Sequence, residues 1–150
     1  MNTINYLLVP EVKLSYRDEN MSKRIRINLS YDAVELLKNV FNDFMQHHEE
    51  CWILLLSQGN RVLGLHKVAQ GSLDQTLVDI RSIMQSVILS NAAAIIVCHN
   101  HPSGELKPSV YDTAITKKMQ EACKIFGISL LDHIIIADEG YYSFTDEGLL

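Results

Sequence analysis

The sequence has few of the features that mark a disulfide-bonded protein, a membrane protein or a secreted one. Its three cysteines are an odd number without a C-x-x-C pair, which argues against a disulfide framework and a cysteine zinc knuckle. The longest apolar runs, such as AAAIIVC, are too short to cross a bilayer. The first residues contain no basic stretch before an apolar run, so we expect no signal peptide. A cytoplasmic protein without membrane contact is expected.

The charge gives no support to nucleic-acid binding. The net charge is −5, whereas tight nonspecific binding to nucleic acid depends on a basic surface. The basic cluster KRIR lies in a segment that alternates like a strand, so a solvated strand face explains it equally well.

The length of 150 residues fits one domain. Residues 1–20 look less regular than the rest and are expected to form an N-terminal arm or edge segment. Residues 21–150 then form a single domain, and an arm of this kind could complete a homodimer.

The apolar pattern of the first half predicts alternating strands and helices. RIRINLS alternates as a half-buried strand does, and Ser30 is the expected N-cap of a helix over residues 31–45. CWILLL and RVLGLHKVA are expected to pair antiparallel around the turn SQGN, where Gly59 can reach a positive φ.

The second half continues this alternation. A helix is expected over residues 78–89, followed by AAAIIVC as a central strand covered on both faces. Another helix is expected over residues 110–126, ended by Gly127, and ISLLDHIIIA and YYSFT form a final hairpin. The order β-α-β-β-α-β-α-β-β predicts an α/β domain with a mixed sheet between helices.

His99 and His101 lie where the central strand is expected to end. Residues i and i+2 of an extended segment project to the same side, so both imidazoles can converge on one ion beyond the carboxyl end of the strand. Ser109 and Asp112 have the spacing of a capping box, so a turn and a capped helix start are the structural alternative.

The combined pattern, His-x-His-Pro, six residues, Ser, two residues, Asp, favours a metal site. Two histidines and an aspartate leave the fourth tetrahedral position open, as in catalytic zinc sites, and a set without thiolate suits zinc or a similar metal. The water activated there needs a proton acceptor, and Glu49 and Glu50 precede a strand predicted to be buried. Neighbouring strand residues face opposite ways, so only one of the two can reach the metal.

These residues resemble the JAMM motif of the MPN (JAB) metalloproteases, a glutamate followed by His-x-His-Pro-x6-Ser-x2-Asp. The strings HNHPSG and LLDHIIIADEGYYSF are similar to the RadC branch of that superfamily, and the resemblance covers about residues 12–150. It implies the MPN fold, which is similar to the cytidine-deaminase architecture.

The resemblance also implies the role of each site residue. His99, His101 and Asp112 would bind Zn²⁺. Glu49, whose position matches the family spacing better than its neighbour, would be the general base and then the acid. Ser109 would hydrogen-bond the water or the developing oxyanion. The implied reaction is hydrolysis of a peptide or isopeptide bond in a protein or peptide substrate.

Longer RadC proteins carry an N-terminal helix-hairpin-helix domain associated with DNA, so this chain is expected to be a short stand-alone form. The alternative function is a non-catalytic MPN scaffold that binds protein or DNA in a DNA-processing context, although the family's DNA-repair label follows from no residue here. A deaminase is disfavoured because the Pro-Cys-x-x-Cys signature is absent. His133 is expected to be a structural histidine rather than a fourth metal ligand, and Asp132 and His133 could form a pair behind the metal.

Overall fold

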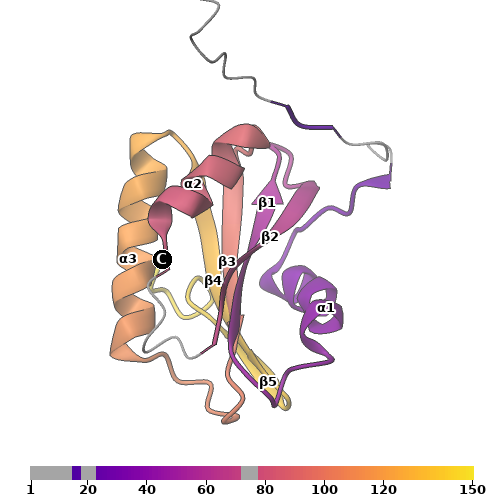
Figure 1. Cartoon of the computed structure of the whole chain (residues 1–150), viewed down its shortest axis with the longest axis vertical. Coiled ribbons are helices and arrows are strands. Elements are labelled where there is room, and N and C mark those ends of the chain that lie inside the picture. The colour runs from indigo at the N-terminus through magenta and orange to yellow at the C-terminus, as the bar shows by residue number, and fades with distance from the viewer. Residues whose placement is uncertain (1–14, 18–22, 72–77) are drawn as a thin grey trace, which may run out of the picture.

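A five-stranded mixed sheet with helices on both faces forms the centre of the fold (Figure 1). The computed structural model describes residues 15–17, 23–71 and 78–150, so most of the predicted arm over residues 1–20 lies outside the described residues. The elements in chain order are α1 (Ser30–Phe41), β1 (Glu50–Leu56), β2 (Val62–Gln70), α2 (Ile80–Leu89), β3 (Ala94–Asn100), α3 (Val110–Ile125), β4 (Ser129–Ala137) and β5 (Gly140–Ser143). The predicted α/β class is confirmed.

The strands follow the order β2-β1-β3-β4-β5 across the sheet. β1 pairs antiparallel with both β2 and β3, β3 pairs parallel with β4, and β5 returns antiparallel to β4. All residues of β3 are buried, as the continuous apolar run predicts for a central strand. The carboxyl ends of β3 and β4 therefore open at the same edge of the sheet.

The two faces of the sheet carry separate apolar cores. α1 covers one face, and α2 and α3 cover the other (Figure 1). Ile53 and Val97 pack in the core under α2 and α3, whereas Leu54 and Ile96 pack in the core under α1. Side chains alternate between the faces along each strand, so odd and even positions of β1 and β3 belong to different cores. The same alternation decides where polar residues at the strand ends point.

The first predicted strand is reduced to a single bridge between Arg26 and Arg61, so the observed order is α-β-β-α-β-α-β-β. Among the described residues, two backbone hydrogen bonds flank this bridge, Ile27 N to Asn60 O at 2.9 Å and Val62 N to Ile25 O at 2.8 Å. The alternation nevertheless predicts correctly that Ile27 is buried.

The first helix is shorter than predicted, and its N-cap position is Leu29 rather than Ser30. The Asp32 carboxylate accepts a hydrogen bond from Leu29 N at 3.1 Å, so a residue inside the first turn supplies the cap. The Ser30 hydroxyl instead donates to Asp146 at 2.5 Å. The helix ends at Phe41, and turns follow up to β1.

The turn between β1 and β2 also differs in detail from the expectation. Asn60 has the positive φ, at 56°, and Gly59 does not. Asparagine tolerates the left-handed region better than most residues, which explains the exchange. In the described parts of the chain, no helix is long and apolar enough to span a membrane.

Candidate metal centre

His99 and His101 lie at the carboxyl end of β3, on the face covered by α2 and α3. His99 is the second-last residue of the strand and is almost fully buried. His101 N donates to Ile136 O at 2.9 Å, which extends the pairing with β4 one residue beyond β3. This extended backbone keeps both imidazoles on one side. Gly104, with φ of +82°, then turns the chain towards α3.

Asp112 reaches the same point from the first turn of α3. The Ser109 hydroxyl accepts from Asp112 N at 3.1 Å, and the Asp112 carboxylate accepts from Ser109 N at 2.7 Å. These two bonds are the capping box that was the structural alternative for this stretch. The box and the cluster coexist, because one Asp112 oxygen can serve the cap while the carboxylate also faces the histidines. The helix cap thus holds Asp112 in place.

The three side chains converge at distances suited to one small ion. His99 Nε2 lies 2.9 Å from His101 Nε2 and 3.2 Å from Asp112 Oδ1, and His101 Nε2 lies 3.7 Å from Asp112 Oδ2. Tetrahedral ligands at the usual zinc–nitrogen distance would stand about 3.3 Å apart. Among the described residues, this is the one group of three or more His, Cys, Asp or Glu side chains that could hold a metal ion.

The charge state of Asp112 follows from its contacts. Burial raises the pKa of this carboxyl, but the hydrogen bond and charge attraction from His99 and the two bonds to Ser109 outweigh burial and hold the pKa well below its usual range. The group is therefore a carboxylate at neutral pH. The carboxylate of Asp112 and the two imidazole nitrogens that it faces can all donate electron pairs to a metal ion.

The outer nitrogens of both rings are also engaged. His101 Nδ1 lies 2.5 Å from the carbonyl oxygen of Glu105, and because a carbonyl can only accept, His101 Nδ1 carries a proton. A neutral His101 ring then has its lone pair on Nε2, which faces the cluster. His99 Nδ1 lies 2.9 Å from His133 Nε2. Burial lowers the pKa of His133 well below its ordinary value, with the neighbouring His99 adding to the effect.

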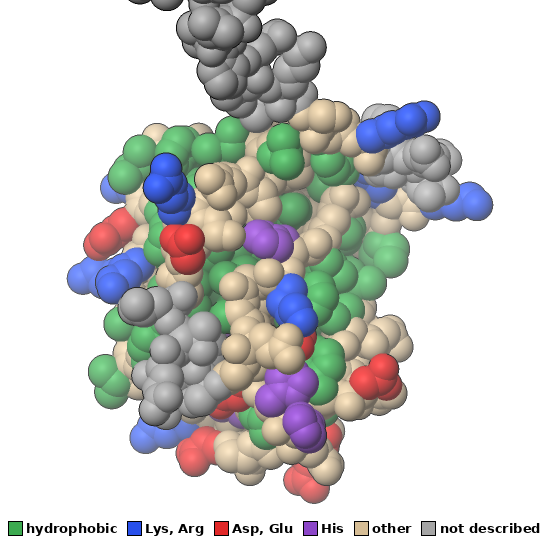
Figure 2. Space-filling view, viewed as in Figure 1, with side chains coloured by type: hydrophobic (Ala, Val, Ile, Leu, Met, Phe, Trp, Pro, Cys, Tyr) green, Lys and Arg blue, Asp and Glu red, His purple; other side chains and the backbone are tan. Residues whose placement is uncertain are grey.

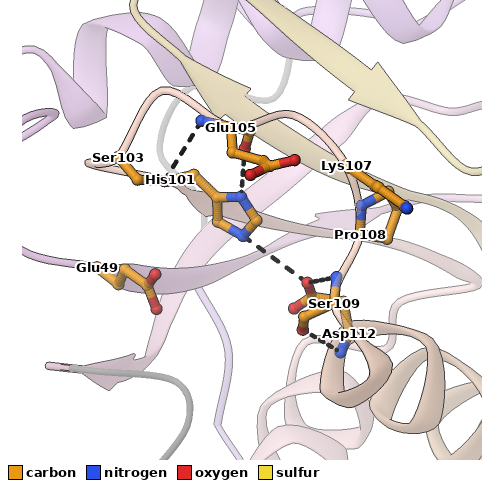
Figure 3. A pocket seen from close by; sticks show the side chains of 8 residues that line it. All are labelled: Glu49, His101, Ser103, Glu105, Lys107, Pro108, Ser109 and Asp112. Carbon is orange, nitrogen blue, oxygen red and sulfur yellow. Dashed lines mark hydrogen bonds and ion pairs between the residues drawn. The ribbon is translucent and has the colours of Figure 1, made fainter.

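A surface pocket lies beside the cluster (Figure 3). Its lining comes from the segment before β1, the loop between β3 and α3, and the start of α3: Glu49, His101, Ser103, Glu105, Lys107, Pro108, Ser109 and Asp112. The Glu49 carboxylate points into the pocket and faces Asp112 across it (Figure 3). Gly71 N donates to Glu49 O at 2.8 Å, which fixes the backbone at this position.

Glu50 lies in a different environment. It is buried, and its carboxylate accepts from Trp52 Nε1 at 2.8 Å and from Lys67 Nζ at 3.2 Å, with His48 Nε2 at 3.0 Å. Burial raises the pKa of Glu50, but the contacts with His48, Trp52 and Lys67 prevail and lower it. Of the two glutamates left open by the strand pattern, the structure places Glu49 beside the cluster.

Behind His99, the His133 ring contacts Thr116, a residue that the sequence pattern does not single out. The His133 ring nitrogens lie within hydrogen-bond distance of His99 and Thr116, whereas the Asp132 carboxylate accepts from the His133 backbone N at 2.8 Å. Thr116 lies one helical turn beyond Asp112, so the i, i+4 spacing would have placed both on one face of the helix. The side on which His133 projects depends on the register of β4, which the sequence does not show.

Charged side chains are intermixed on the face of the molecule seen in Figure 2. Lysine and arginine side chains alternate with aspartate and glutamate there, and among the described residues of this face they do not gather into one basic surface. This distribution agrees with the acidic net charge.

Comparison with known proteins places the chain in a family. A family model described as "RadC-like JAB domain" matches residues 27–149. A "UPF0758 protein" of Flavobacterium johnsoniae is 39% identical over 133 residues, covering 89% of this chain and 57% of the relative. A "UPF0758 protein" of Porphyromonas gingivalis is 36% identical over 98% of this chain and 64% of the relative. The chain therefore spans about three fifths of the length of these relatives. It belongs to the RadC-like JAB domain family.

Proposed function

We propose that this protein is a zinc-dependent hydrolase of the JAMM type that cleaves a peptide or isopeptide bond. The observation that carries the proposal is the convergence of His99, His101 and Asp112 within 2.9–3.7 Å beside a pocket that also contains Glu49. The substrate class, a protein or peptide, is inferred from the family relationship.

The donor set supports a metal ion. His101 Nε2 presents a lone pair, because its Nδ1 is committed to the Glu105 carbonyl. Asp112 is also an electron-pair donor, and a cation between its carboxylate and the His101 nitrogen would stabilise their approach. Two imidazoles and one carboxylate suit zinc, and they leave a fourth position open towards the pocket.

The roles of the surrounding residues follow from their positions. When bound, zinc would polarise the scissile carbonyl and lower the pKa of a water molecule. Glu49, which points into the pocket, would accept a proton from that water and return it to the leaving amine. The Ser109 hydroxyl would donate to the developing oxyanion, because accepting the cap bond from Asp112 N leaves its own proton available.

The remaining expectations belong to the same proposal. The three cysteines are free and buried, which supports a reducing compartment such as the cytoplasm. A homodimer through the N-terminal arm stays a prediction.

A substrate screen with matched glutamate variants tests the proposal. Zinc-loaded protein is incubated with a mixed peptide library and with isopeptide-linked protein conjugates, and cleavage is followed by mass spectrometry. Wild type should cleave at least one class, and a chelator should abolish the cleavage. Glu49→Gln should keep its zinc and lose about 100-fold or more of kcat, whereas Glu50→Gln should keep kcat. Cleavage that survives Glu49→Gln would refute the assigned base, and zinc binding without any cleavage would favour the non-catalytic scaffold.

A further inference from the structure

We propose that His133 and Thr116 form a hydrogen-bonded relay that sets the tautomer of His99 and so presents its Nε2 lone pair to the metal. This inference rests on the proposed metal site. Both residues are positioning residues, since neither faces the pocket in which the substrate would bind.

The contacts form a closed ring. His99 Nδ1 lies 2.9 Å from His133 Nε2, and His133 Nδ1 lies 2.5 Å from Thr116 Oγ1. Thr116 Oγ1 lies 2.6 Å from the backbone carbonyl oxygen of Asp112, whose carboxylate returns to His99 Nε2 at 3.2 Å. One proposed ligand is thus linked to another through two side chains that bind no metal themselves.

The proton on Thr116 determines the direction of every bond in the relay. Two oxygens 2.6 Å apart must share a proton, and the Asp112 carbonyl has none, so the Thr116 hydroxyl donates to it. The Thr116 oxygen can then only accept from His133, which places the proton of the neutral His133 ring on Nδ1. His133 Nε2 is left with a lone pair and accepts from His99 Nδ1. A neutral His99 ring, with its proton on Nδ1, therefore presents the lone pair of Nε2 to the ion.

The opposite direction would be incompatible with a metal. If Thr116 donated to His133 Nδ1, the His133 proton would move to Nε2 and His99 would carry its own proton on Nε2. That proton would occupy the place of the ion. Metal-binding histidines usually donate their second N–H to an oxygen that fixes the ring, and here an imidazole and a hydroxyl perform that task.

The surroundings keep the relay rigid. His133 and Thr116 are 1% and 5% exposed, so solvent water does not compete for their hydrogen bonds. Phe144 stacks on the His133 ring with centroids 4.9 Å apart and an interplanar angle of 10°. The stacking fixes the plane of the ring, and β4 and α3 fix its two partners.

Zinc affinity of matched threonine variants tests the relay. Thr116→Val removes the hydroxyl at nearly constant shape, Thr116→Ser restores it, and Thr113→Val is the control. The Thr113 hydroxyl makes the same type of bond, to Ser109 O at 3.2 Å, but lies on the exposed side of α3. In competition with a chelator, we expect Thr116→Val to weaken zinc binding about 10- to 100-fold, with wild-type affinity in the other two variants. A folded Thr116→Val protein with wild-type affinity would overturn the proposal.

A second measurement needs no variant and separates this inference from the metal site. Nitrogen-15 NMR of the histidine rings in metal-free wild type should show a protonated Nδ1 on both His99 and His133. A His99 ring without a proton on Nδ1 would overturn the relay even if zinc binds. If the spectra show the expected tautomers but zinc does not bind, the proposed function fails and the relay stands.

Discussion

The carboxylates of Glu49 and Glu50 lie on opposite sides of the sheet, although the two residues are adjacent in the chain. Glu49 shares its side with Cys51 and the core under α2 and α3, and it lines the pocket with His101 and Asp112. Glu50 shares its side with the core under α1 and contacts Trp52. The alternation of a strand thus assigns one glutamate to the pocket and the other to a structural contact.

This separation predicts different costs for removing the two carboxylates. Glu50→Ala should lower the free energy of unfolding by about 2 kcal/mol, because the bonds from Trp52 and Lys67 are lost in a buried place. Glu49→Ala should cost less, because Glu49 is only half-buried whereas Glu50 is buried. Urea unfolding of both metal-free variants measures the difference. An equal loss of unfolding free energy in the two variants would contradict the placement of Glu49 at the pocket and Glu50 in a structural contact.

Ser109 should contribute to both stability and catalysis. Ser109→Ala removes the N-cap bond of α3 and should cost about 1 kcal/mol of unfolding free energy. Asp79→Ala removes the corresponding bond of α2, in which the carboxylate accepts from Arg81 N at 3.0 Å, at a similar cost. Only Ser109→Ala should also lower kcat, by about 100-fold, since only its hydroxyl lines the pocket. Equal kcat values in the two variants would assign Ser109 to the cap alone.

The cysteines should make the protein less stable in alkali. Burial raises the pKa of Cys51 to about 12, with Asp112 adding to the effect, and that of Cys123 to about 11, whereas an unfolded thiol titrates at about 8.5. Both folded values are raised, so this contribution to stability is complete below about pH 8.5 and is lost as pH rises towards the folded values. Unfolding curves at pH 7 and pH 10 should show the loss, and it should be smaller in a Cys51→Ala, Cys123→Ala double variant. An identical loss in the double variant would exclude the thiols of Cys51 and Cys123 as its source.

Gly127 and Gly59 should respond differently to alanine. Gly127 has φ of +67° directly after α3, so Gly127→Ala should cost about 1 kcal/mol although nothing lies within 4 Å of the added methyl group. Gly59 has no such backbone conformation and the same open surroundings, so Gly59→Ala should be neutral or slightly stabilising. Thermal unfolding of both variants measures this, and a larger cost at Gly59 would contradict the observed turn.

Much of the fold follows from local patterns. The central strand, the helix ended by Gly127 and the final hairpin were all predictable, because burial on both faces, a glycine after a helix and a short turn leave clear signals. The predicted length of the first strand was wrong, since the alternation of residues 24–28 is compatible with either a full strand or a single bridge. The number of partners that a segment finds is a tertiary property, which alternation does not encode.

Part of the grouping of the site residues was also predictable from the sequence. Spacing along β3 and α3 places His99, His101 and Asp112 near one another, and the structure brings their side chains together. The choice between Glu49 and Glu50 needed the strand phase, which one residue of uncertainty at the start of β1 would reverse. The contacts of Thr116 and His133 depend on how α3 lies against β4, and nothing in a linear pattern specifies that packing.

Zinc stoichiometry tests the central claim most directly. Wild type, His101→Ala and Asp112→Asn are saturated with zinc, freed of excess metal and analysed by plasma mass spectrometry, with His47→Ala as the control at an exposed histidine. We expect about one zinc per chain in wild type and in His47→Ala, and little or none in the other two variants. Equal zinc in all four proteins, or none in wild type, would contradict a metal centre formed by His99, His101 and Asp112.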